Sequence, residues 1–147
     1  MNESTSRQPD ASFGVRQLRL VVEADDFDAA VRFYRDALGL PEEFTVETGD
    51  ARVIALQAGR ATLEIVNPAQ RQLIDDVEVG RQVSRDIRVA FEVTDVAMAT
   101  EAVRAGGAEL IAPPTETPWH SLNARLEAPA GLQITLFQEL VEPGQPA

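Results

Sequence analysis

An internal repeat constrains this chain more than any other feature of its sequence. The segment LRLVVE, with Asp26 three residues after it, recurs as IRVAFE with Asp95 three residues after it, at a constant offset of 69 residues. Each aspartate can cap a helix, predicted over 27–38 in the first copy and over 96–105 in the second, because its carboxylate accepts hydrogen bonds from free amides of the first turn. A chain that repeats a strand, a cap and a helix in this way builds two similar units.

Strand and turn signals follow each predicted helix. The predicted strands cover 43–47, 52–57 and 61–66 in the first copy and 109–112, 122–127 and 132–138 in the second. A Pro-rich loop is expected over 113–121. With the first strands at 18–23 and 87–92, the order of elements is βαβββ, twice.

This order divides the chain into two units over 17–66 and 87–140, joined by a linker over 67–86. Apolar residues at mixed spacing in 68–82 predict a short helix followed by a loop. The ends, 1–16 and 141–147, are polar and rich in proline and glutamine, so we expect mobile tails.

Alternate residues of the predicted strands separate into an apolar face and a polar face. The apolar face must lie under the helices, and the polar face either meets water or lines a groove. The apolar face consists of Leu18, Leu20, Val22, Leu63, Ile65, Ile87, Val89, Phe91, Val93, Leu132, Ile134 and Leu136. The polar face includes Arg19, Glu64, Arg88 and Thr135.

Charge and composition exclude several classes of function. Thirteen basic residues against 24 acidic ones give a net charge of −11, without a basic run to bind nucleic acid or an anionic membrane surface. The chain has no cysteine and one histidine, His120, so it cannot build a thiolate site or a site with two imidazoles. No targeting signal and no membrane-length apolar stretch are visible, which predicts a cytoplasmic protein.

The two copies resemble the vicinal oxygen chelate superfamily, which includes glyoxalase I, extradiol dioxygenases and the bleomycin and fosfomycin resistance proteins. The matching stretches are LRLVVEADDFDAAVRFYRDALGL, IRVAFEVTDVAMATEAVRAGGAEL and APAGLQITLFQ. The resemblance implies an α+β fold in which each βαβββ unit forms a half-barrel, so that a curved mixed sheet surrounds a central cup with the helices on the outer face. It also implies a homodimer.

The resemblance further implies four positions at which enzymes of this superfamily usually hold a divalent metal. In this sequence these positions are Arg19, Glu64, Arg88 and Thr135, and only Glu64 matches the usual set of His or Gln, Glu, His and Glu. A guanidinium stays protonated and has no lone pair for a cation. We therefore expect no metal site and no cofactor.

Two interpretations of Arg19, Glu64 and Arg88 remain open. They form a structural ion-pair cluster that joins the two halves in place of a metal, or their surplus positive charge binds a carboxylate, phenolate or quinone oxygen of a ligand.

Further candidate ligand contacts are Glu92, Arg125, Trp119 and His120. Glu92 and its counterpart Glu23 could pair with Arg125 or face a cationic part of a ligand. Trp119 offers a flat apolar wall and His120 a titratable group, although a loop anchor and an exposed loop residue are equally open interpretations.

Two classes of function follow. The first is a metal-independent protein that encloses an aromatic or polycyclic small molecule, as in drug or metabolite sequestration of the bleomycin-resistance type. The second is an enzyme, a lyase, isomerase or dioxygenase-like protein with an unconventional or metal-free site that uses Glu64 or His120 as a base. The missing metal ligands favour the first.

Overall fold

The computed structural model describes residues 17, 19–62 and 64–140. The two predicted tails lie outside the described residues, as do Leu18 and Leu63 of the predicted apolar face. Within the described part of the chain, no helix is both long and apolar enough to cross a membrane.

The second repeat forms a complete four-stranded sheet in the order β3-β6-β5-β4. Its parallel pair, β3 and β6, and its antiparallel pairs, β6 with β5 and β5 with β4, agree with the predicted unit. The strands are β3 (Arg88–Glu92), β4 (Glu109–Glu116), β5 (Ser121–Ala128) and β6 (Leu132–Glu139).

The helix of this repeat, α3 (Val96–Ala105), begins at the predicted cap. The Asp95 carboxylate accepts a hydrogen bond from the amide of Met98 at 3.1 Å. One prediction in this repeat is wrong: β4 continues through Pro113 and Pro114, so the loop covers only 117–120. Prolines fit here because β4 is an edge strand with irregular register beside them, where a missing amide hydrogen breaks no required ladder bond.

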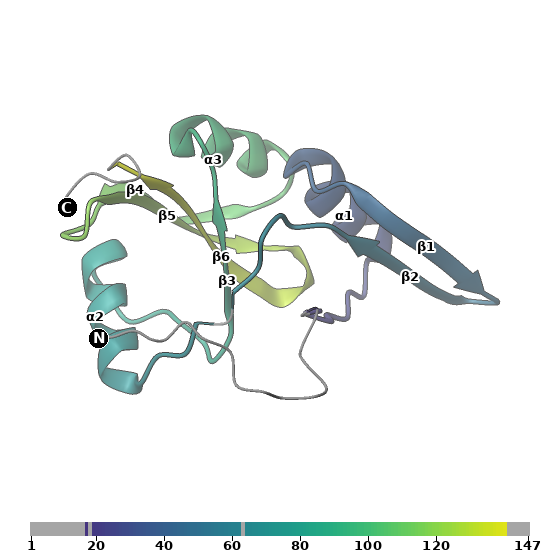
Figure 1. Cartoon of the computed structure of the whole chain (residues 1–147), viewed down its shortest axis with the longest axis horizontal. Helices are drawn as coiled ribbons and strands as arrows, with labels where there is room; N and C mark the ends of the chain where they lie inside the picture. The colour runs from purple at the N-terminus through teal and green to yellow at the C-terminus, as the bar shows by residue number, and fades with distance from the viewer. Residues whose placement is uncertain (1–16, 18, 63, 141–147) are drawn as a thin grey trace, which may run out of the picture.

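The first repeat forms its helix and its hairpin as predicted. The helix consists of α1 (Phe27–Val31) and a π-helical turn, η2 (Arg32–Ala37), and Asp26 caps it by accepting from the Ala29 amide at 3.0 Å. The hairpin joins β1 (Glu42–Thr48) to β2 (Ala51–Leu56) as an antiparallel pair and extends away from the main sheet (Figure 1).

The outer strands predicted for the first repeat are absent from the described residues. Residues 19–24 and 64–67 belong to no strand, and Val21 and Ile65 are 85% and 84% exposed. The reason is the position of the first helix, because Phe33 and Tyr34 from η2 are buried in the core over the second repeat's sheet. The first repeat therefore covers its neighbour's apolar face, and its own apolar segments remain without a helix above them.

The core lies on one side of the four-stranded sheet, between its apolar face and the helices α1, η2 and α3 (Figure 1). The sequence prediction of this face is confirmed in the middle of the second repeat's sheet, where Ile134 and Leu136 are fully buried, but not at Ile87, which is 61% exposed. The buried core cluster contains Phe33, Tyr34, Val96, Val103, Ala108, Ala124, Leu126, Ala128, Ile134 and Leu136.

The linker helix, α2 (Pro68–Glu78), lies on the opposite side of the sheet from α3 (Figure 1). Its start is well determined, because Asn67 accepts from the Gln70 amide at 2.9 Å and Pro68 occupies the first turn. The predicted short helix is therefore confirmed, but its place is unexpected. The polar face of the second repeat was predicted to meet water or line a cup. α2 covers the part of it on β5 and β6, where Arg125 and Gln133 are buried, whereas Glu92 on β3 stays exposed.

Candidate functional site

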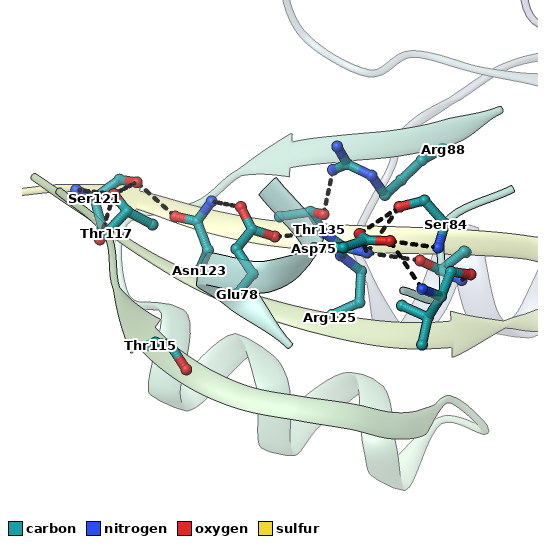
Figure 2. A network of polar contacts seen from close by, with 12 residues as sticks. Asp75, Glu78, Ser84, Arg88, Thr115, Thr117, Ser121, Asn123, Arg125 and Thr135 are labelled. Atoms are coloured by element: carbon teal, nitrogen blue, oxygen red, sulfur yellow. Dashed lines mark hydrogen bonds and ion pairs between the residues drawn. The ribbon is translucent and has the colours of Figure 1, made fainter. Parts of the chain in front are cut away.

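A fully buried arginine lies at the centre of the polar face. Arg125 of β5 has 0% of its side chain exposed and pairs with two carboxylates of α2. Its Nη1 donates to Asp75 Oδ1 at 2.9 Å, and its Nη2 donates to Glu78 Oε1 at 2.7 Å. Gln133 of β6 accepts a third bond from Nη1 at 2.9 Å. Figure 2 shows this network, in which α2 and the sheet meet through charged groups.

Asp75 is held on the linker side by backbone and hydroxyl donors. The amides of Val83 and Ser84 each donate to Oδ2 at 2.8 Å, and the Ser84 hydroxyl lies 2.6 Å from Oδ1. Burial alone would raise the pKa of Asp75, but the hydrogen bonds from Ser84, Arg125 and Val83 outweigh it and lower the pKa to about 2. Asp75 is therefore a carboxylate at neutral pH.

The network continues from Glu78 toward the turn between β4 and β5. Asn123 donates from Nδ2 to Glu78 Oε2 at 2.7 Å and accepts from the Ser121 hydroxyl at 2.6 Å. The hydroxyls of Ser121 and Thr117 lie 2.9 Å apart. A row of buried polar groups thus runs along β5 under α2 (Figure 2).

Arg88 of β3 lies beside this row, and its guanidinium forms one hydrogen bond with the described residues. Its Nη1 donates to the hydroxyl of Thr135 at 2.5 Å. Burial and the charge of Arg125 lower the pKa of Arg88. In the described part of the chain, the Nε atoms of Arg88 and Arg125 are buried without a hydrogen-bond partner. Such groups are uncommon, because a buried donor without a partner loses its hydrogen bonds to water and gains no hydrogen bond within the protein.

The predicted convergence of Arg19, Glu64 and Arg88 is not what the structure shows. The guanidinium of Arg19 lies over the ring of Phe44 in β1, 5.2 Å from its centre. Glu64 is exposed and forms no ion pair with any described residue, although its charge favours the protonated form of Arg88. Only Arg88 and Thr135 of the predicted set are in contact.

The remaining candidates separate into exposed and buried groups. Trp119, 43% exposed, and His120 lie in the turn between β4 and β5, and His120 has a φ of 65°. Glu92 is exposed on β3. The predicted pairing of Arg125 with Glu23 or Glu92 is replaced by its pairing with α2. Among the described residues, the side chains of Glu64 and His120 have no hydrogen-bond partner that would make either one a base.

Sequence reasoning missed Asp75 and Glu78, the two acidic partners of the site. A signal for them existed, because residues three apart share one face of a helix. Polar side chains alternating along β5 and β6, such as Asn123, Arg125 and Gln133, also require partners once the sheet is covered.

The residues at the superfamily's metal positions do not fit a divalent cation. Arg19 and Arg88 carry positive charge and no lone pair, and the hydroxyl of Thr135 accepts from Arg88. Within the ranges that the structure describes, no group of three or more His, Cys, Asp or Glu residues is placed to hold a metal ion. The acidic pair Asp75 and Glu78 is instead bound to a guanidinium.

Comparison with known proteins agrees with the repeat and the fold. The sequence profile of the Glyoxalase/Bleomycin resistance protein/Dioxygenase superfamily matches residues 16–136, and the chain belongs to this superfamily. A search of curated proteins found no match.

Solved structures extend this result to the fold. The chain is similar to a glyoxalase-related enzyme from Fulvimarina pelagi, with 19% identity, a TM-score of 0.54 and coverage of 88% of this chain and 92% of that one. It is also similar to a protein of unknown function from Agrobacterium tumefaciens, with 23% identity, a TM-score of 0.52 and coverage of 87% and 99%. At these identities the likeness concerns the fold alone.

Proposed function

We propose that this protein binds a small anionic, aromatic molecule without a metal, on the polar face of the second repeat. Arg88 and Arg125 supply the positive charge and Thr135 a hydroxyl. Sequestration of a drug or metabolite is the role that such binding would serve.

The observation that carries this proposal is the pair of guanidinium groups whose buried Nε–H groups have no hydrogen-bond partner among the described residues. Arg125 already pairs with two carboxylates, and Arg88 adds a second guanidinium whose only hydrogen bond within the described residues is to a neutral hydroxyl. Guanidinium groups bind carboxylates and phenolates through charge-assisted hydrogen bonds. Turnover would need a base, and neither Glu64 nor His120 has a contact that supports the enzymatic alternative.

Binding can be measured by isothermal titration calorimetry. Benzoate, phthalate, salicylate and their neutral methyl esters form a suitable set of probes. We expect an acid to bind and its ester not to bind. Arg88→Gln should weaken binding by about 10- to 100-fold, since a hydrogen bond to a charged group contributes about 1.5 to 3 kcal/mol.

The matched control is Arg104→Gln, which removes the same charge from an exposed position on α3 and should leave the affinity unchanged. Equal affinities for acid and ester, or an unaffected Arg88→Gln variant, would contradict the proposal. One equivalent of a divalent metal per purified chain, found by elemental analysis, would refute metal independence.

We also propose that the chain forms a homodimer. Exposed apolar side chains in the first repeat and at the start of β3 support it, since Val21, Ile65 and Ile87 are 85%, 84% and 61% exposed. A second copy would cover the segments that lack a helix in a single chain. Pairing would make the unfolding midpoint depend on protein concentration.

A further inference from the structure

The contacts of α2 with the sheet are mainly ionic. Its buried residues are Ile74, Asp75 and Glu78, and of these only Ile74 is apolar. Leu73 is 49% exposed, and none of the α2 residues belongs to the core cluster. A helix with so little apolar burial has a low free energy of local opening, because hydrophobic contacts supply most of the resistance to detachment.

The two carboxylates of α2 occupy the position of a bound anion. Asp75 and Glu78 both contact one guanidinium, Arg125, at 2.9 and 2.7 Å. An incoming carboxylate can make the same bonds, while the released side chains regain water. The exchange replaces one set of charge-assisted hydrogen bonds by another of the same type.

The chain on both sides of α2 allows such a movement. Residues 64–67 before it and 81–87 after it belong to no helix or strand. Gly80, two residues after the last residue of the helix, has a φ of 86°, a left-handed value that glycine adopts without strain. The helix can therefore move without breaking a ladder of the sheet.

We propose that α2 is a displaceable plug that closes the ligand site by presenting Asp75 and Glu78 to Arg125, and that an anionic ligand binds by replacing them. The identity of the ligand rests on the function proposed above, whereas the opening of the plug does not.

Modification of arginine by phenylglyoxal, followed residue by residue with peptide mass mapping, measures the opening without any ligand. In the native protein, Arg125 can react only when α2 has moved away. The variant Asp75→Asn/Glu78→Gln removes both negative charges at nearly constant shape. We expect its Arg125 to react at least about 10-fold faster than in the wild type, because the closed state has lost its ionic contacts.

The matched control is Asp76→Asn, which removes one carboxylate from the exposed side of the same helix, where it accepts a bond from Gln82. Its Arg125 should react at the wild-type rate, and Arg104 should react equally in all three proteins. An unchanged rate at Arg125 in the double variant would overturn the plug.

Hydrogen exchange distinguishes local opening from unfolding. In the wild type, amides of α2 should exchange at least about 10-fold faster than those of β5 and β6, and the double variant should keep the sheet amides protected. If α2 and the sheet exchange at the same rate, the helix opens only by global unfolding and the plug is refuted.

Phthalate tests the ligand separately. Slower modification of Arg125 in the double variant in the presence of phthalate supports both the plug and the anionic ligand. Fast modification that phthalate does not slow supports the plug and contradicts the function proposed above.

Discussion

The two repeats have the same sequence pattern and different structures. The second builds a four-stranded sheet with a helix on its apolar face and a second, linker helix on its polar face. The first builds a helix and a hairpin, and its other segments, 19–24 and 64–67, remain exposed. The difference lies in the place of one helix, because η2 packs with α3 over the second sheet.

The same alternating pattern forms a strand in one repeat and not in the other. Alternating apolar residues form a strand only where a neighbouring edge and a covering layer are available. In the second repeat both are present. In the first repeat, the helix that would cover such a sheet packs over the second repeat's sheet instead. Val22 and Ile65 therefore have the apolar spacing of a strand but remain exposed.

The largest expected effect concerns burial in the segments predicted as the last strand of each repeat, of which only the second forms a strand. Leu136→Ala should lower the free energy of unfolding by about 2 to 5 kcal/mol, because Leu136 is fully buried and its loss leaves a cavity. Ile65→Ala, in the first repeat, should change it by less than about 0.5 kcal/mol at low protein concentration. Urea denaturation measures both values.

If the chain forms the proposed homodimer, the two variants should respond differently to protein concentration. The effect of Ile65→Ala should grow with protein concentration, whereas that of Leu136→Ala should already be large in the single chain. A large loss for Ile65→Ala that is independent of concentration would mean that the first repeat buries this residue within its own chain.

A second prediction compares two charged residues. Arg125→Ala should lower the free energy of unfolding by about 3 kcal/mol, because it leaves Asp75 and Glu78 buried without a cation. Glu64→Ala should have an effect below about 0.5 kcal/mol, because Glu64 is exposed and without an ion pair among the described residues. Thermal and urea denaturation measure both losses. A larger loss for Glu64→Ala than for Arg125→Ala would support the predicted cluster of Arg19, Glu64 and Arg88 instead.

The smallest effect concerns the joint between the repeats. Tyr34 of η2 donates from its hydroxyl to the carbonyl of Pro129 at 2.7 Å, in the turn η3 (Pro129–Gly131) before β6. Burial, with a smaller contribution from Glu127, raises the pKa of Tyr34, so its hydroxyl stays a donor. Tyr34→Phe should lower the free energy of unfolding by about 1 kcal/mol.

The control for Tyr34 lies within the first repeat. Thr45→Val removes an exposed hydroxyl that contacts Glu42 at 2.6 Å and should have no measurable effect. Equal losses for the two variants in urea denaturation would show that the joint is no stronger than a surface contact.

Much of the fold could be predicted from the sequence, because its signals are local. The caps Asp26 and Asp95, the hairpin of the first repeat and the apolar face of the second were all predicted. The error at Pro113 arose because proline is compatible with an edge strand, and edge position is a property of the sheet order. The missing outer strands of the first repeat depend on where a helix packs, which local periodicity does not contain.

The site was less predictable than the fold. Arg88 and Thr135 were identified on the polar face and are in contact, whereas Arg125 was predicted as a candidate ligand contact and as a partner of Glu23 or Glu92. The pairing of Arg125 with Asp75 joins residues separated by 50 positions in the sequence. Coulomb attraction does not depend on sequence spacing, so Glu23, Glu92 and Asp75 were equivalent candidates until the chain was placed in space.

Several features follow from the sequence alone: the repeat, the capped helices, the polar and apolar faces, and arginine at two positions where the superfamily usually holds a metal. Each follows from residue chemistry or from a period of a few residues. That α2 covers part of the polar face and that its carboxylates pair with Arg125 depends on how the whole chain packs. The physical reason is that an uncovered polar face and a covered one have the same sequence pattern, and they differ only in which distant charges come within hydrogen-bonding distance.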